Sequence, residues 1–186
     1  MLDTVKSRIN GLDLTALGEV VEGIEEDPSR AKVGFDVTTR WTGQTGSRTT
    51  VDGFTLAGER IPRSHTIFAD EPSELLGSDG APNPQELLMA ALNACMTVGY
   101  VAGAALKGIT LDKLEIHTSG NLDLRGFLGL SDRVPPGYES IQYEVRMSGN
   151  GTSEQFEEIH QAVMKTSPNY FNLNRPIRMN GSLRVD

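Results

Sequence analysis

The sequence has 186 residues, of which 38% are hydrophobic and 23% are charged, with a formal net charge of −8 and one cysteine. This length suits one domain with a hydrophobic core in a soluble globular protein. The acidic balance argues against a nucleic-acid partner, because no basic stripe exists that would neutralise phosphates. One cysteine excludes an internal disulfide, and the three histidines are scattered, so we expect neither a metal nor a cofactor.

The N-terminal residues predict a small helical appendage. The first stretch, MLDTVKSRINGLDLTALGEVV, lacks the layout of a secretory signal peptide, so we expect a reducing, cytoplasmic location. Apolar positions recur at three-and-four spacing from Asp13 to Glu26, which predicts an amphipathic helix that Pro28 ends. We therefore expect residues 1–30 to form an appendage and residues 31–186 to form the main domain.

Strand-like alternation begins after this appendage. In VGFDVTTRW, residues 33–41, apolar and polar side chains alternate, and residues 49–56 and 62–69 predict two further strands. The stretch DEPSELLGSDGAPNP is rich in Gly, Pro and acidic residues and predicts a solvated acidic loop. A long helix is expected next, and then strands at residues 111–122 and 141–147.

The C-terminal region completes a mixed fold. Thr152 and Gln155 have the spacing of a capping box and predict the start of a second helix in the main domain. A final strand is predicted for the alternating apolar residues Ile177, Met179, Leu183 and Val185. This order of elements predicts an α+β fold, in which antiparallel sheets pack around one long buried helix.

The long helix is predicted by NPQELLMAALNACMTVGYVAGAALKG, residues 83–108. Asn83 suits the N-cap and Pro84 the first turn, and Glu86 is expected to bind a backbone amide as a cap rather than to act in catalysis. The charge-free span 87–106 is long enough to cross a membrane, but its Ala, Gly and polar content favours a helix buried in a soluble protein. One domain covers such a helix with difficulty, so we expect a homodimer that shares its core and no membrane association.

Cys95 lies in the middle of this helix. The helical period places it about 200° from Asn93, on a face with Ala91, Gly99 and Ala102. Small apolar neighbours oppose ionisation of a thiol, and buried free cysteines often act only as small core residues. The same neighbours allow another helix to approach closely. The pattern alone leaves open whether Cys95 is reactive.

The stretch PNPQELLMAALNAC resembles the central helix of the OsmC/Ohr family, the osmotically inducible C proteins and organic hydroperoxide resistance proteins. The resemblance runs from about residue 32 to the end and includes ITLDKLEIHTSGNLDLRGFLG and TSPNYFN. It implies an OsmC-like fold and an intertwined homodimer with active sites at the interface. In active members, a cysteine on this helix attacks an organic hydroperoxide, and a second cysteine before a proline resolves the sulfenic acid. An arginine and a glutamate hold the thiolate ready.

The chain matches this set of residues only in part. Cys95 corresponds to the first cysteine, but Ser167 stands where the second is expected and Gln85 stands where the glutamate is expected. Arg48 is preferred to Arg40 as the arginine beside the thiol, although a solvated strand face would explain either one. Because serine cannot form a disulfide, a two-cysteine cycle is excluded, and a one-cysteine cycle needs an external thiol as reductant.

Two functions follow from this resemblance. The first is a one-cysteine thiol peroxidase for organic hydroperoxides, in which Cys95 is the nucleophile, Arg48 stabilises the thiolate and an external thiol is the reductant. The alternative is a catalytically degenerate module that binds a small hydrophobic ligand or a partner, with Cys95 only lining the pocket. A redox sensor has no residue-level support beyond the isolated cysteine.

Overall fold

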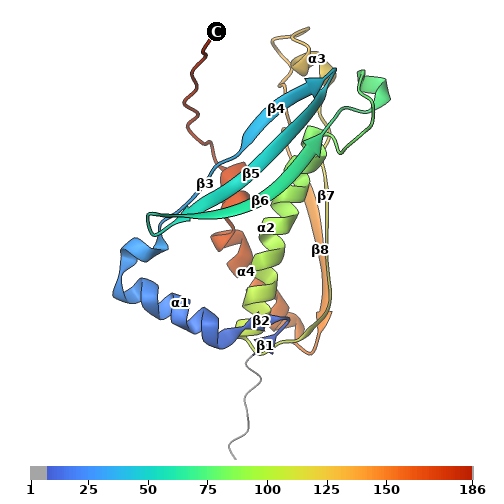
Figure 1. Ribbon diagram of the computed structural model, residues 1–186. Helices are drawn as coiled ribbons and strands as arrows, with labels where there is room; N and C mark the ends of the chain where they lie inside the picture. Colours follow the sequence, from blue (N-terminus) through green and yellow to red (C-terminus); the bar gives the residue numbers. More distant parts are fainter. Residues whose placement is uncertain (1–7, 186) are drawn as a thin grey trace, which may run out of the picture. The chain divides into compact units, whose positions relative to one another are not determined.

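The computed structural model describes residues 8–185 (Figure 1). The chain divides into two compact parts, residues 1–90 and 91–186, and the boundary falls within the long helix α2 (Pro84–Leu106). Each part has its own secondary structure and is described by itself.

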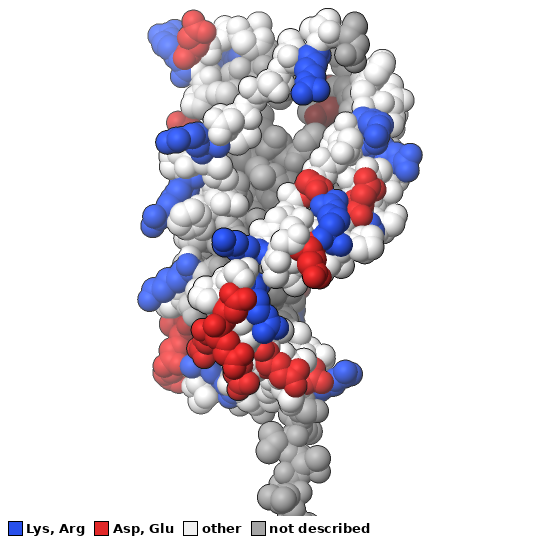
Figure 2. All heavy atoms as spheres, turned by 60° about the vertical axis from the view of Figure 1, so that its left-hand side comes forward, with Lys and Arg blue, Asp and Glu red and all other residues white. Residues whose placement is uncertain are grey.

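The first part begins with a short hairpin and a helix. Strands β1 (Arg8–Ile9) and β2 (Leu12–Asp13) pair antiparallel and lead into α1 (Leu14–Glu26) and the short 3-10 helix η1 (Pro28–Ala31). The Asp13 side chain caps α1 by accepting the N–H groups of Thr15 and Ala16, both at 3.1 Å. Figure 2 shows Asp and Glu side chains gathered on the lower part of the face that it draws. The predicted N-terminal helix is confirmed.

A four-stranded antiparallel sheet forms the centre of the first part. Its central strand is β5 (Gly46–Leu56), which pairs with β6 (Glu59–Ala69) on one side and with β3 (Val33–Phe35) and β4 (Thr38–Gly43) on the other. The single strand expected over residues 33–41 is thus interrupted between β3 and β4. Within the interruption, the Asp36 carboxylate accepts two hydrogen bonds from the Arg60 guanidinium, at 2.6 and 2.9 Å.

The start of α2 is capped from both directions. A loop with the short 3-10 helix η2 (Ser73–Leu75) leads to Asn83, whose side-chain oxygen accepts the Gln85 N–H at 2.7 Å. The Glu86 carboxylate in turn accepts the Asn83 N–H at 2.8 Å. This reciprocal arrangement satisfies two donors that a helix start leaves free. The prediction that Glu86 serves as a cap is confirmed.

The second part packs residues 91–106 of α2 on a hairpin and a helix. The hairpin consists of β7 (Leu111–Ser119) and β8 (Gln142–Gly149), joined by a linker that contains α3 (Leu124–Phe127). Helices α4 (Ser153–Thr166) and α5 (Pro168–Asn174) follow. The core of this part consists of the buried residues Leu92, Met96, Tyr100, Ala104, Ile109, Ile159 and Val163.

Two glycines allow α2 and α4 to approach closely. A Cβ atom on Gly99 would lie 3.0 Å from a Val163 methyl carbon, and one on Gly103 would lie 3.1 Å from an Ile159 methyl carbon. The sequence pattern predicted such an approach on the face that carries Cys95. The Thr152–Gln155 capping box at the start of α4 is also present as predicted.

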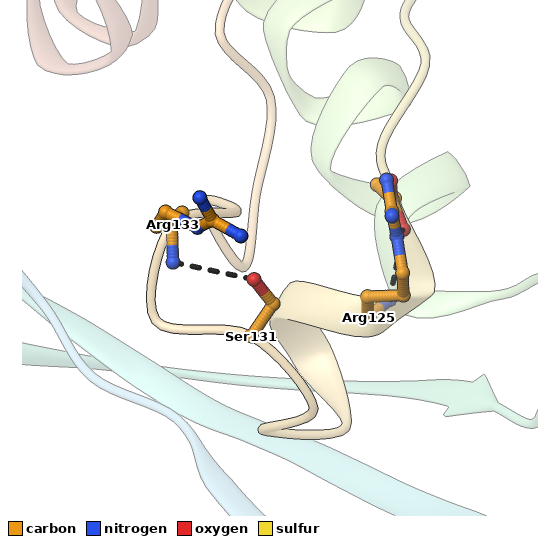
Figure 3. A network of polar contacts seen from close by, with 4 residues as sticks. Arg125, Ser131 and Arg133 are labelled. Atoms are coloured by element: carbon orange, nitrogen blue, oxygen red, sulfur yellow. Dashed lines mark hydrogen bonds and ion pairs between the residues drawn. The ribbon is translucent and has the colours of Figure 1, made fainter.

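The linker between β7 and β8 carries a small polar network (Figure 3). The Arg125 guanidinium binds the Asp123 carboxylate through Nε at 3.0 Å, and the Arg133 N–H lies 3.4 Å from Ser131 Oγ. Arg125 is therefore neutralised within its own turn. Large apolar side chains around it are exposed: Leu124, Phe127, Leu128 and Leu130.

The predicted final strand is wrong for the single chain. Residues 175–185 contain no strand, although their apolar side chains alternate as expected. Met179, Leu183 and Val185 are each at least 85% exposed. A strand needs a neighbour for its backbone hydrogen bonds, and this segment pairs with none of the described strands. The alternation is present, but the partner is not within the described chain.

Helix α2 is long and apolar enough to cross a membrane by length and composition. The core helix of a soluble protein passes the same test, so a single such helix is weak evidence for a span. Within the second part, one face of α2 is buried in the core described above, while Val98 and Leu106 are 70% and 68% exposed.

Candidate functional site

The Cys95 thiol is the candidate nucleophile from the sequence analysis, and it is free and partly buried. Its sulfur lies 3.3 Å from the Ser167 hydroxyl oxygen, which donates a hydrogen bond to it. A partly exposed thiol beside a hydroxyl is not sealed in hydrocarbon, as a pure core residue would be. The structure therefore brings together the two positions, Cys95 and Ser167, that the resemblance assigned to a pair of cysteines.

Helix α5 holds Ser167 in place against α2. Ser167 is 5% exposed and caps α5, because its hydroxyl oxygen accepts the Tyr170 N–H at 3.4 Å. The Asn169 side-chain amide donates to the Ala91 carbonyl at 2.8 Å, one helical turn before Cys95. This tether ties the first turn of α5 to the turn of α2 that carries the thiol.

An aromatic cluster supports this corner of the second part. The rings of Tyr170 and Tyr143 meet edge to face, and those of Tyr143 and His160 are tilted, with centroids 6.2 and 6.3 Å apart. The Tyr100 hydroxyl lies 2.6 Å from His160 Nδ1, and Tyr100 is fully buried. Burial raises the pKa of Tyr100 well above its ordinary value, with the neighbouring Tyr143 and Glu157 adding to the effect. These aromatic side chains pack on one another and join α5, through Tyr170, to β8 and α4.

Arg48 and Arg40 lie on neighbouring strands of the first part. They are directly opposite each other in the pairing of β4 with β5, and both are exposed. Cys95 belongs to the other part of the chain. An approach of Arg48 to the thiol therefore stays a prediction. Gln85, in the first turn of α2, is a neutral amide and brings no charge to the site.

The first part contains a hollow of about 460 Å³ that sequence reasoning missed. It is lined by the β4–β5 turn, the end of β6 and the following loop. Asp70 in its wall is 5% exposed, which corrects the prediction that this acidic loop is solvated throughout. Nothing in the spacing of the loop residues indicated that Asp70 would turn inward.

The Asp70 carboxylate is fully occupied by donors from its own surroundings. It accepts hydrogen bonds from the hydroxyls of Ser78 at 2.5 Å and Thr45 at 2.7 Å, and from the N–H groups of Glu71, Ser78 and Gly80. The Ser78 and Thr45 hydroxyls, followed by the Gly80 N–H, lower the pKa of Asp70 far below its ordinary value. We interpret Asp70 as a clamp for the loop, because no lone pair is left for a ligand.

Metal binding finds no support in the side chains that the structure describes. Among residues 8–185, no group of three or more His, Cys, Asp or Glu side chains lies close enough together to hold a metal ion.

Comparison with known proteins identifies the family. The model of the OsmC-like protein family matches residues 77–181, which is more than half of the chain. Among solved structures, an OsmC-like protein from Mycoplasma pneumoniae is 19% identical, with a TM-score of 0.56 over 75% of this chain and 86% of that one. An OsmC-like protein of unknown function from Vibrio cholerae is 15% identical, with a TM-score of 0.55 over 74% and 91%.

The chain belongs to the OsmC-like protein family and has the OsmC-like fold, an α+β arrangement of antiparallel sheets and helices. At 15–19% identity, the structural likeness shows the fold alone. No curated protein sequence gives a significant match. The fold and the family are thus established.

Proposed function

We propose that the protein is a one-cysteine thiol peroxidase that reduces organic hydroperoxides with an external thiol. The observation that carries the proposal is the free, partly buried Cys95 on the central helix of an OsmC-like fold, hydrogen-bonded to Ser167. In the active members that the sequence resembles, a cysteine on this helix performs the attack. The substrate class comes from that resemblance.

The proposed reaction has three steps. The Cys95 thiolate attacks the O–O bond, takes up one oxygen atom as sulfenic acid and, with one proton, releases the alcohol. A thiol of the reductant then condenses with the sulfenic acid, which gives a mixed disulfide and water. A second thiol attacks that disulfide, releases the oxidised reductant and restores Cys95. Ser167 cannot replace the first reductant thiol, so an external one has to reach the sulfur.

Arg48 is our candidate for the cation that holds the thiolate ready. An arginine close to a thiol favours the charged form. Arg48 has no partner carboxylate among the described ion pairs, so its guanidinium is free to turn toward an anion. The first measurement is the rate of hydroperoxide reduction after Arg48→Ala, with Arg40→Ala as the matched control, and we expect the larger loss for Arg48→Ala.

We also propose that the active form is a cytoplasmic homodimer. The exposed apolar side chains of residues 177–185 support this, because a strand with one apolar face and no neighbour is suited to pairing with another chain.

Steady-state turnover tests the proposed activity. Purified protein is mixed with cumene hydroperoxide and either a monothiol or a dithiol, and loss of peroxide is followed for the natural chain, Cys95→Ser and Ser167→Ala. We expect turnover that depends on thiol and disappears in Cys95→Ser, since serine is a far weaker nucleophile. Equal peroxide loss with Cys95→Ser would contradict the proposal. In that case the alternative, a binding module for a small hydrophobic ligand, would gain support.

A further inference from the structure

Ser167 is fixed in place more firmly than a helix cap requires. It stands between α4 and α5, where its N–H donates to the Val163 carbonyl at 2.8 Å and its carbonyl accepts the Phe171 N–H at 3.0 Å. Pro168 follows directly and restricts Ser167 to the extended backbone that it adopts, with φ −69° and ψ 118°. The backbone thus sets the direction of the Ser167 side chain before any contact with Cys95 is made.

The hydrogen-bond roles of the Ser167 hydroxyl follow from its surroundings. A serine hydroxyl has one proton to donate and two lone pairs. One lone pair accepts the Tyr170 N–H, which is a role that only the oxygen can fill. Cys95 Sγ, at 3.3 Å, is the described acceptor for the proton. Ser167 is 5% exposed as a residue, so bulk water competes little for that proton.

We propose that Ser167 is a positioning residue of the thiol site, whose hydroxyl donates to the Cys95 sulfur and stabilises it as thiolate and, after oxidation, as sulfenate. This inference rests on the proposed peroxidase function. A hydrogen bond to the charged form of a group favours that form, and charge-assisted bonds are the stronger ones. The resemblance implies a resolving thiol at position 167. Instead, the Ser167 hydroxyl donates a hydrogen bond to the Cys95 sulfur, and an external thiol has to form the disulfide.

The test separates this role from peroxidase activity. The rate of Cys95 alkylation by iodoacetamide is measured from pH 5 to pH 10 in the folded protein, which reports the thiolate without any peroxide. We expect Ser167→Ala to slow the alkylation of Cys95 roughly tenfold at the lower pH values, because the thiolate loses the hydrogen bond that the Ser167 hydroxyl donates. Ser167→Thr keeps a hydroxyl at this position, so we expect its alkylation rates to match those of the natural protein.

A matched control removes a cap without touching the sulfur. Thr152 caps α4 in the same part of the chain, with its hydroxyl accepting the Gln155 N–H at 3.3 Å. Thr152→Ala and Ser167→Ala each remove one N-cap hydroxyl, so both variants lose helix stability for the same reason. Unchanged alkylation rates in Thr152→Ala, with slower ones in Ser167→Ala, support the proposal. Equal slowing in both variants, or none in Ser167→Ala, overturns it.

A second variant tests the geometry independently of acidity. In Ser167→Cys, the azo oxidant diamide takes two electrons and two protons from the two thiols, which join as a disulfide between Cys95 and the introduced thiol. The 3.3 Å separation of Sγ and Oγ leaves only a small movement to reach S–S bonding distance. We expect a loss of two mass units, reversed by reductant, in the folded protein. No intramolecular disulfide with diamide would overturn the placement, even if the natural protein turned over hydroperoxide.

Discussion

At the residue scale, Tyr100 and Asp70 show how single polar groups are made compatible with burial. Tyr100 combines a fully buried ring with a hydroxyl bonded to His160 at 2.6 Å, so its burial leaves no polar atom without a partner. The Asp70 carboxylate is likewise fully hydrogen-bonded, to five donors from its own loop and the β4–β5 turn. The sequence indicated neither arrangement, because His160 lies 60 residues from Tyr100 and no spacing rule predicts the donors to Asp70.

Tyr100→Phe tests the buried hydroxyl through alkaline pH. The raised pKa of Tyr100 means that the folded state keeps the proton to higher pH than the unfolded state does. The unfolded tyrosine ionises above about pH 10, so this contribution to stability is complete below that pH and is lost as pH rises. We expect the free energy of unfolding of the natural chain, measured in urea, to fall above pH 10 by about 1 kcal/mol per pH unit relative to Tyr100→Phe. If the free energies of unfolding of the natural chain and of Tyr100→Phe changed in parallel above pH 10, this interpretation of Tyr100 would be contradicted.

Asp70→Asn tests the loop clamp through acid pH. The pKa of Asp70 is depressed in the folded state, first by the Ser78 hydroxyl, so the ionised form stabilises the fold above the unfolded pKa of about 4. That contribution is lost as pH falls through the folded pKa. We expect Asp70→Asn to have a lower urea midpoint than the natural chain at pH 7. The difference between the two midpoints should become smaller below pH 4. Asp79→Asn, on the same loop, is the matched control and should behave like the natural chain.

At the element scale, the contact between α2 and α4 depends on glycines. Gly99→Leu would push a side chain into Val163, from which even a Cβ atom would be 3.0 Å away. Overpacking of this kind costs about 1–3 kcal/mol. Gly18→Leu on α1 is the control, because a Cβ there meets no atom within 4 Å. We expect urea unfolding to register the loss for Gly99→Leu only, and equal losses in both variants would contradict this view of the contact.

Most elements could be predicted because their signals are local. Spacing and caps predicted α1, α2 and α4 within about two residues, since a helix start is determined by Asp13, Asn83 or Thr152 and the few residues that follow. Helix α5 was missed, because Ser167 ends one helix and caps the next. The strand at residues 177–185 failed because a strand also needs a neighbour, and local alternation cannot supply one.

At the scale of the whole molecule, the exposed C-terminal segment predicts a dimer. We expect light scattering to give twice the chain mass of 20.2 kDa. Met179→Asp combined with Leu183→Asp places charges on the apolar face of the segment and should shift the dimer toward monomer. Asn180→Asp combined with Ser182→Asp adds the same charge to the other face and should not. A monomer in the natural protein, or equal effects of both pairs, would refute this prediction.

The sequence predicted the cysteine of the candidate site, but it predicted fewer of the residues around that cysteine. The resemblance pointed to Cys95 and to the position of Ser167, and the structure brings these two within 3.3 Å. The direction of the hydrogen bond depended on the Tyr170 N–H, which no spacing rule reveals. The sequence favours Arg48 over Arg40 only through its place after the β4–β5 turn, because both arginines follow the same strand pattern and lie opposite each other.

The most direct measurement follows the oxidation state of the single thiol. The protein is treated with one equivalent of cumene hydroperoxide in the presence of dimedone, and intact mass and peptide mapping locate the adduct. If the sulfur is a thiolate held by Ser167 and open to peroxide, each chain gains one dimedone group on Cys95 and one molecule of cumyl alcohol is released. A thiol that stays free and unlabelled while the peroxide remains intact would contradict the account.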